Sequence, residues 1–172
     1  FIAGKFVPAV DGQTFSSVNP ATGKVLAQVA ACSAEDVDLA VKSARTAFES
    51  GVWSQLPPAS RKAVLLRLSQ LILENRDELA LLDSLNMGKP VMDAYNIDVP
   101  GSAQVFAWYA ESLDKYYGQV APTSNATLAT ITREPLGVVA ATPSENGWIV
   151  AVVCLQSAEV QGASELAGTI LQ

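Results

Sequence analysis

Residues 131–141 read Ile-Thr-Arg-Glu-Pro-Leu-Gly-Val-Val-Ala-Ala. Both ends of this segment are strand-like, and Pro135 and Gly137 interrupt the run between them. The second half is a continuous apolar run, as in a strand that is covered on both faces. The segment also marks a boundary, because the sequence before it predicts a helix-rich region, whereas residues 142–172 contain neither lysine nor arginine. The sequence therefore predicts an α/β chain divided into residues 1–126, 127–141 and a divergent tail, 142–172.

Composition restricts the function classes. The 172 residues are 49% hydrophobic and 16% charged, which indicates a globular protein with one domain, or one domain and part of another. The net charge is −6 and the 11 basic residues are scattered, so no nucleic-acid partner is expected. No apolar run approaches the roughly 20 residues needed to cross a bilayer. With no leader pattern at the first residues, we expect a cytoplasmic protein with no membrane partner.

Reactive residue types are few. The chain has no histidine, which excludes Ser-His-Asp and Cys-His catalysis and the common histidine-containing zinc sites. No metal site is expected. Its two cysteines, Cys32 and Cys154, are too few to predict a disulfide framework.

The first helix has clear boundaries. Ser33-Ala34-Glu35-Asp36 matches a capping box, in which a Ser hydroxyl and an acid three residues later satisfy free backbone amides. Apolar residues from Val37 to Phe48 then recur at helical spacing. Gly51 is placed to end the helix.

Two more helices are predicted after it. The second opens at Pro57-Pro58 and stops at Gly88-Lys89-Pro90, with Asn75-Arg76-Asp77 as a candidate break or bend. The third is expected from about Gly101 to Tyr117, with Gly118 as its terminator. Core packing is the expected use of its apolar and aromatic face, which comprises Val105, Phe106, Tyr109, Leu113 and Tyr116.

Strands are expected on both sides of the helices. Phe1 to Phe15 is predicted to form a hairpin with Asp11-Gly12 as a turn. Asn19 to Gly23 is a second turn, which leads into the alternating strand Lys24 to Ala30. Thr127 to Thr132 alternates apolar and hydroxyl residues, which is typical of a strand with one solvated face.

The order of these motifs resembles that of the NAD(P)-dependent aldehyde dehydrogenases, and most closely the bacterial branch that oxidises gamma-glutamyl-gamma-aminobutyraldehyde and related aminoaldehydes. The resemblance covers about residues 1–141. It rests on Phe1-Ile2-Ala3-Gly4-Lys5-Phe6, Asn19-Pro20-Ala21-Thr22-Gly23, the capped helix from Ser33, Trp53 followed by Arg61, Met87-Gly88-Lys89-Pro90, Trp108-Tyr109-Ala110, and Arg133-Glu134-Pro135-Leu136-Gly137-Val138.

The resemblance implies the N-terminal hairpin and helices of such an enzyme, with an incomplete Rossmann-like cofactor domain whose first strand is Leu136 to Ala141. It also implies that strands around Thr127 to Glu134 contribute to an oligomerisation arm, so a homo-oligomer is expected. The implied activity is oxidation of an aldehyde to a carboxylic acid with NAD or NADP, by thiolate attack, hydride transfer and thioester hydrolysis. Most of the family's catalytic parts come later than this region.

The sequence departs from the family after Ala141. Thr142-Pro143-Ser144-Glu145-Asn146-Gly147-Trp148 stands where the family has a Pro-Trp-Asn turn, and an ungapped continuation places Asn146 on the oxyanion asparagine. The Pro and Trp that would hold that turn are missing, and no Lys-Pro-Ser-Glu follows to bind the ribose. Cofactor binding by this chain is therefore not expected by the usual route.

None of the remaining candidates has a catalytic setting. Cys154 lies in an apolar run, which raises a thiol pKa, so a structural thiol is expected. Cys32 precedes a helix start, and we expect an ordinary thiol there as well. The acids of the tail are expected to be solvated, and its glycines do not match Gly-x-Gly-x-x-Gly. These residues are Glu145, Glu159, Glu165, Gly162 and Gly168.

Three interpretations remain open. The first is an aldehyde dehydrogenase segment that is inactive as this chain alone, because the nucleophile and base motifs are missing. The second is a non-enzymatic oligomerisation or interaction module, because the strand at Thr127 to Thr132 would present an unpaired edge. The third is a complete enzyme whose sequence differs after Ala141.

Overall fold

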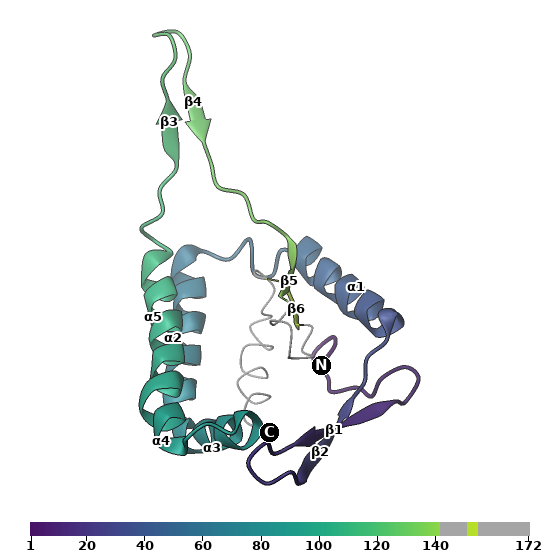
Figure 1. The fold of residues 1–172 in the computed structure, drawn as a ribbon. Coiled ribbons are helices and arrows are strands. Elements are labelled where there is room, and N and C mark those ends of the chain that lie inside the picture. Colours follow the sequence, from purple (N-terminus) through teal and green to yellow (C-terminus); the bar gives the residue numbers. More distant parts are fainter. Residues whose placement is uncertain (142–150, 155–172) are drawn as a thin grey trace.

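The computed structural model describes residues 1–141 and 151–154, and its mixture of helices and strands confirms the predicted α/β class (Figure 1). Its helices are α1 (Ala34–Ser50), α2 (Pro58–Glu74), α3 (Arg76–Met87), α4 (Val91–Asp93), the π-helical turn η1 (Ala94–Asp98) and α5 (Val99–Ser112). Its strands are β1 (Thr14–Val18), β2 (Val25–Ala30), β3 (Gln119–Ala121), β4 (Ala129–Ile131), β5 (Val138–Ala141) and β6 (Ala151–Cys154).

The N-terminal hairpin lies further along the chain than predicted. β1 pairs antiparallel with β2, from Thr14 opposite Ala30, around the predicted turn at Asn19 to Gly23. The expectation of a hairpin over Phe1 to Phe15 is wrong. Within residues 1–15, Ile2 and Lys5 form an isolated β-bridge, and Asp11-Gly12 closes a local turn that leads into β1.

Helix α1 has the predicted ends. The Asp36 carboxylate accepts the backbone N–H of Ser33 at 2.8 Å, and Gly51 follows the last turn with φ of 72°. Asp36 is 3% exposed and also accepts the backbone N–H of Val10 at 2.9 Å, which ties the N-terminal segment to the helix. The hydrogen bond from Ser33 is the largest cause that holds the pKa of Asp36 below its usual range.

The predicted second helix breaks where expected. Asn75 separates α2 from α3, and its side-chain amide donates to the carbonyl of Leu71 at 2.9 Å. Gly88 ends α3 in the left-handed conformation, with φ of 70°. The turn of the β1–β2 hairpin lies against this end, because a Cβ on Gly88 would be 2.7 Å from Cγ of Pro20.

The third helix begins earlier and ends earlier than the predicted range of about Gly101 to Tyr117. Helical backbone starts at Val91 in α4, continues through η1 and ends with α5 at Ser112. Its buried positions Ala94 and Val99 are five residues apart, which matches a π turn rather than the α spacing of three or four. This change of spacing hides the first turns from a search for α periodicity.

Pro100 accounts for the π turn. The N–H of Val99 reaches back five residues to the carbonyl of Ala94, and the next donor in that series is missing because proline has no N–H. The carbonyl that Pro100 leaves without a helical partner is that of Tyr95. Arg76 Nε donates to it at 2.7 Å, and the Arg76 guanidinium lies 3.8 Å from the centroid of the Tyr95 ring.

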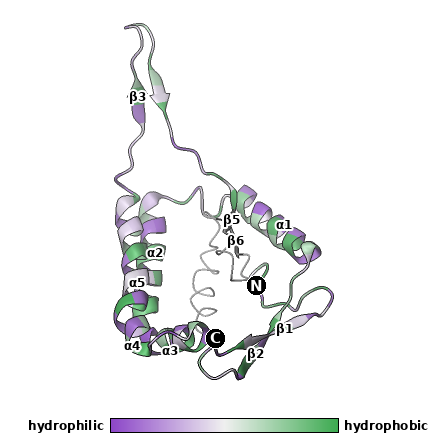
Figure 2. Cartoon of the chain, viewed as in Figure 1, coloured by the Kyte–Doolittle hydropathy of each residue, from purple (hydrophilic) through white to green (hydrophobic). Residues whose placement is uncertain are grey.

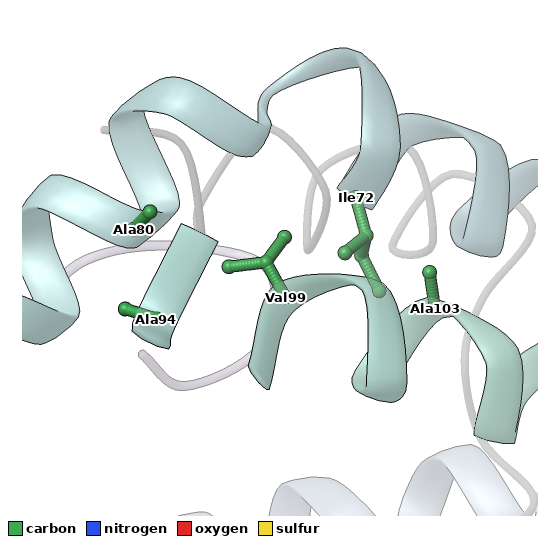
Figure 3. Packing of buried hydrophobic residues seen from close by; sticks show 5 residues of the cluster. All are labelled: Ile72, Ala80, Ala94, Val99 and Ala103. Carbon is green, nitrogen blue, oxygen red and sulfur yellow. The ribbon is translucent and has the colours of Figure 1, made fainter. Parts of the chain in front are cut away.

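The core of the described region is small and lies between α2, α3 and α5. Figure 3 shows Ile72 of α2 between Val99 and Ala103 of α5, with Ala80 of α3 close to Ala94. Ser69 of α2 adds a buried hydrogen bond of 2.7 Å to the carbonyl of Ala103. Small side chains let these helices approach closely, but no large side chain among the described residues is fully buried.

The remaining strands lie away from this core. β3 and β4 form an antiparallel arm that projects from the helices (Figure 1), and β4 is shorter than the predicted strand at Thr127 to Thr132. β5 pairs antiparallel with β6 and packs against α1. Parallel strands joined by a helix, which a Rossmann-like sheet requires, do not occur among the described strands.

Replacement of Gly88 by alanine should destabilise the fold. A left-handed conformation costs a non-glycine residue about 1–2 kcal/mol, and the new Cβ would also overlap Pro20. We expect Gly88→Ala to lower the free energy of unfolding in urea, measured by far-ultraviolet circular dichroism. Gly101→Ala is the control, because Gly101 is helical with nothing within 4 Å of its Cβ position, and should be neutral or stabilising. Equal effects of the two changes would contradict this account of Gly88.

A double-mutant cycle tests the role of Pro100. Arg76→Met should cost about 1–3 kcal/mol of unfolding free energy, because the carbonyl of Tyr95 loses its donor. In a Pro100→Ala background the same change should cost clearly less, since residue 100 then supplies a backbone N–H. Additive effects would show that Arg76 does not compensate for the proline.

Candidate functional site

The predicted catalytic position is not among the described residues. Asn146, the sequence-based oxyanion candidate, lies outside them, as do Glu145, Glu159, Glu165, Gly162 and Gly168. Their placement in a site therefore stays a prediction.

The two cysteines lie in different settings. Cys32 carries a free, exposed thiol one residue before the N-cap Ser33. Cys154 is the last residue of β6, opposite Val138 of β5, and its side chain lies outside the described part. The nearby Asp36 carboxylate does not serve Cys32 as a free base, because it accepts the backbone N–H groups of Ser33 and Val10.

The described residues do not fit a dinucleotide. Such a cofactor places its pyrophosphate on a glycine-rich turn at a helix N-terminus after a strand. Of the described strands, only β2 leads directly into a helix, and that connection, Ala31-Cys32-Ser33, contains no glycine. The backbone N–H of Ser33, at the N-cap of α1, already donates to the Asp36 carboxylate, whose charge would repel a phosphate. The described part also holds no group of three or more potential metal ligands.

The most distinctive surface of the described region is the outward face of α5, defined here as Gly101, Val105, Trp108, Tyr109 and Ser112. It lies opposite the buried positions Val99, Ala103 and Ala110 on the helix. Val105 is 53% exposed and Trp108 is 59% exposed, and the rings of Trp108 and Tyr109 meet edge to face at 5.0 Å.

This exposure corrects the prediction of core packing for the aromatic face. Tyr109 and Tyr116 are more than half exposed, and Phe106 is 37% exposed. The reason is that the small residues Ala103 and Ala110, rather than the aromatic ones, face α2.

An ion-pair cluster lies where α5 leads toward the arm. Lys62 of α2 binds Glu111 at 2.5 Å and Asp114 at 3.6 Å, and Lys115 also pairs with both acids. The hydrogen bond with Glu111 raises the pKa of Lys62, and the same contact lowers the pKa of Glu111. These charges satisfy one another at an exposed surface, and both pKa shifts favour the charged form, so neither Lys62 nor Glu111 is poised to exchange a proton near neutral pH.

A second apolar surface lies at the N-terminus. The turn at Ile2 and the segment Val7 to Val10 form a hollow against Leu39 of α1. Apart from Asp36, Ser43 and Lys5, its lining is apolar, so it resembles an uncovered packing surface more than a catalytic cleft.

Arg76 and Pro100 are the residues whose importance the sequence did not reveal. The available signal was the five-residue apolar step from Ala94 to Val99 immediately before a proline. A half-buried arginine as the donor for the carbonyl of Tyr95 could have been sought at the preceding Asn75-Arg76-Asp77 break.

Comparison with known proteins gives a consistent result. The model of the aldehyde dehydrogenase family matches residues 6–151. Aminoacetaldehyde dehydrogenase of Pseudomonas aeruginosa is 52% identical over 139 residues, which are 81% of this chain and 28% of that protein. The NADP/NAD-dependent aldehyde dehydrogenase PuuC of Escherichia coli is 47% identical over 82% of this chain, which corresponds to 28% of the length of PuuC.

Solved structures agree with this. The gamma-glutamyl-gamma-aminobutyraldehyde dehydrogenase of Burkholderia cenocepacia superposes with a TM-score of 0.78 and 49% identity, over 80% of this chain and 28% of that one. The indole-3-acetaldehyde dehydrogenase AldA of P. syringae, solved with NAD+, gives the same TM-score at 47% identity, over the same shares of the two chains.

The chain thus spans a little over a quarter of the length of these relatives. Among the described residues, no helix is long and apolar enough to cross a membrane. The matched motifs, the helical scaffold and the projecting arm lead to one conclusion: the chain belongs to the aldehyde dehydrogenase family, of which it contains an N-terminal part.

Proposed function

We propose that these residues are the N-terminal scaffold of a cytoplasmic enzyme that oxidises an aminoaldehyde to a carboxylic acid with NAD or NADP. The observation that supports this most is the 52% identity to an aminoacetaldehyde dehydrogenase over 81% of the chain. A solved relative at 49% identity is also named for an aminoaldehyde. The free thiol of Cys32 is consistent with a reducing compartment.

The role that the described geometry supports is structural. The α2–α3–α5 unit holds the outward face of α5 and the arm in place, while the described residues provide no nucleotide site. No catalytic step is assigned to them. We therefore propose that the 172 residues alone do not turn over an aldehyde.

An enzyme assay tests this part of the proposal. The purified chain, incubated with aminoacetaldehyde and either NAD or NADP, should form no reduced cofactor at 340 nm. The P. aeruginosa relative, purified in the same way, is the positive control. Aldehyde-dependent reduction that is lost on Cys154→Ser, but not on Cys32→Ser, would contradict the proposal and identify the nucleophile.

A second function, self-association through the arm, is favoured by the exposure of its side chains. Val120 is 68% exposed and Leu128 is 79% exposed, and among the described strands β3 and β4 pair with each other alone. An unpaired edge with apolar side chains is a site for strand addition.

Light scattering tests the arm. The mass of the wild-type chain should rise with concentration, and Val120→Asp with Leu128→Asp should hold it at the monomer value, because charges oppose burial of the arm. Gln70→Asp, at an exposed position of α2, is the control. A wild-type chain that stays monomeric over a wide concentration range would exclude this function.

A further inference from the structure

The arm formed by β3 and β4 is uncharged along its length, whereas its base is charged. Residues 116–132 contain no aspartate, glutamate, lysine or arginine. Asp114 and Lys115 precede this segment, and Arg133 and Glu134 follow it. Figure 2 shows hydrophilic colouring on both legs where the arm leaves the rest of the chain. Charged contacts that fix the direction of the arm are therefore confined to its base.

An ion-pair network joins the start of the arm to α2. The Lys62 ammonium of α2 lies 2.5 Å from Glu111, in the last turn of α5, and 3.6 Å from Asp114, beyond the end of that helix. Lys115 binds the same two acids, at 3.7 Å and 2.7 Å. Among the ion pairs of the described residues, those of Lys62 alone connect α2 with this segment. A network of this kind holds its members more firmly than an isolated surface pair does.

The outgoing leg of the arm is also joined to the returning leg. The Arg133 guanidinium lies 5.3 Å from the centroid of the Tyr116 ring, as in a cation–π contact. A Cβ on Gly118 would lie 3.0 Å from the carbonyl oxygen of Ile131, so the two backbones approach closely there. Because the legs are joined in these two places, an anchor on the outgoing leg restrains the whole arm.

We propose that Lys62 is a positioning residue for the arm: by binding Glu111 and Asp114 it fixes the direction in which β3 and β4 project, and salt loosens this anchor. The two acidic side chains are 55% and 49% exposed, so dissolved ions reach the network. The Lys62 side chain is 24% exposed, and packing around its stem limits where its ammonium can lie.

The anchor is separate from the core. Ile72 and Ser69 hold α2 against α5 through apolar contact and a hydrogen bond to the carbonyl of Ala103, without Lys62. Loss of the anchor should therefore free the arm and leave the helices folded, because exposed ion pairs contribute little to global stability. An arm held in one direction loses less conformational freedom when a partner binds to its edge. Lys62 acts within a single chain, so its role does not depend on self-association of the arm.

Residual dipolar couplings test the anchor, because they report the orientation of each backbone N–H relative to one molecular frame. The isotope-labelled chain would be aligned in a stretched, uncharged polyacrylamide gel, at low salt and at a concentration where light scattering gives the monomer mass. Couplings from β3 and β4 should fit the same alignment tensor as those from α2 and α5. In Lys62→Met the couplings of the arm should fall toward zero, while those of the two helices stay unchanged.

Arg67→Met is the matched control, because Arg67 also lies on α2 and pairs with an acid, Glu74, but within the same helix. It should leave all couplings unchanged, and Lys62→Arg should do so too because arginine keeps the charge. Addition of about 1 M NaCl, which shortens the Debye length to about 3 Å, should reduce the arm couplings of the wild type to the level of Lys62→Met.

Arm couplings that stay unchanged in Lys62→Met or in high salt, or that fall equally in Arg67→Met, would overturn the proposal. Helix couplings that change together with those of the arm would overturn it as well, because Lys62 would then support the helices and not the direction of the arm.

Discussion

Pro100 cannot donate a backbone hydrogen bond, and the helical scaffold adapts to that one constraint. The helix widens to a π turn, Val99 bonds back to Ala94, and Arg76 supplies the donor that the carbonyl of Tyr95 would otherwise lack. The wider turn has a packing consequence. A four-residue step from Ala94 would direct Asp98 to the core, whereas the five-residue step directs Val99 there. Asp98 pairs with Lys89 instead, and this hydrogen bond raises the pKa of the lysine.

The phase of α5 after this turn determines which residues meet α2. Ala103 and Ala110 take the buried positions, so the two helices lie close together and Ser69 can reach the carbonyl of Ala103. The large side chains of Val105 and Trp108 then face away from the only described core. A scaffold of this kind buries its alanines and leaves aromatic residues of α5 exposed.

Local signals in the sequence predicted the local features well. The capping residues at Ser33 and Gly51, the break at Asn75 and the stop at Gly88 all act within one helical turn, so a single sequence is enough to find them. The hairpin predicted over Phe1 to Phe15 is wrong because Asp11-Gly12 indicates a turn but not which flanking residues pair; the hairpin forms between β1 and β2 instead. The third helix begins earlier than predicted for another reason. A proline together with a five-residue apolar step does not match α-helical periodicity, so the sequence of these first turns is typical of a loop.

The candidate site could be predicted less well than the fold. Ordered motifs identified the family, because a scaffold carries its signature in caps and turns. The oxyanion candidate Asn146 lies outside the described residues, so its role rests on sequence position alone. The exposed face of α5 was predicted as core, since periodicity reveals that a face is apolar but not which of two apolar faces is covered in this chain.

Amide hydrogen exchange of the chain tests the central claim, that α2, α3 and α5 hold the buried core of the described residues and that the other described elements lie outside it. The account predicts slow exchange confined to Pro58 to Ser112, with fast exchange in α1, in the β1–β2 hairpin and in the β3–β4 arm. Equally slow exchange in α1, the β1–β2 hairpin and α5 would mean that the chain unfolds as one cooperative domain. That result would contradict the account, because it would mean that these elements share one cooperative core with α2, α3 and α5.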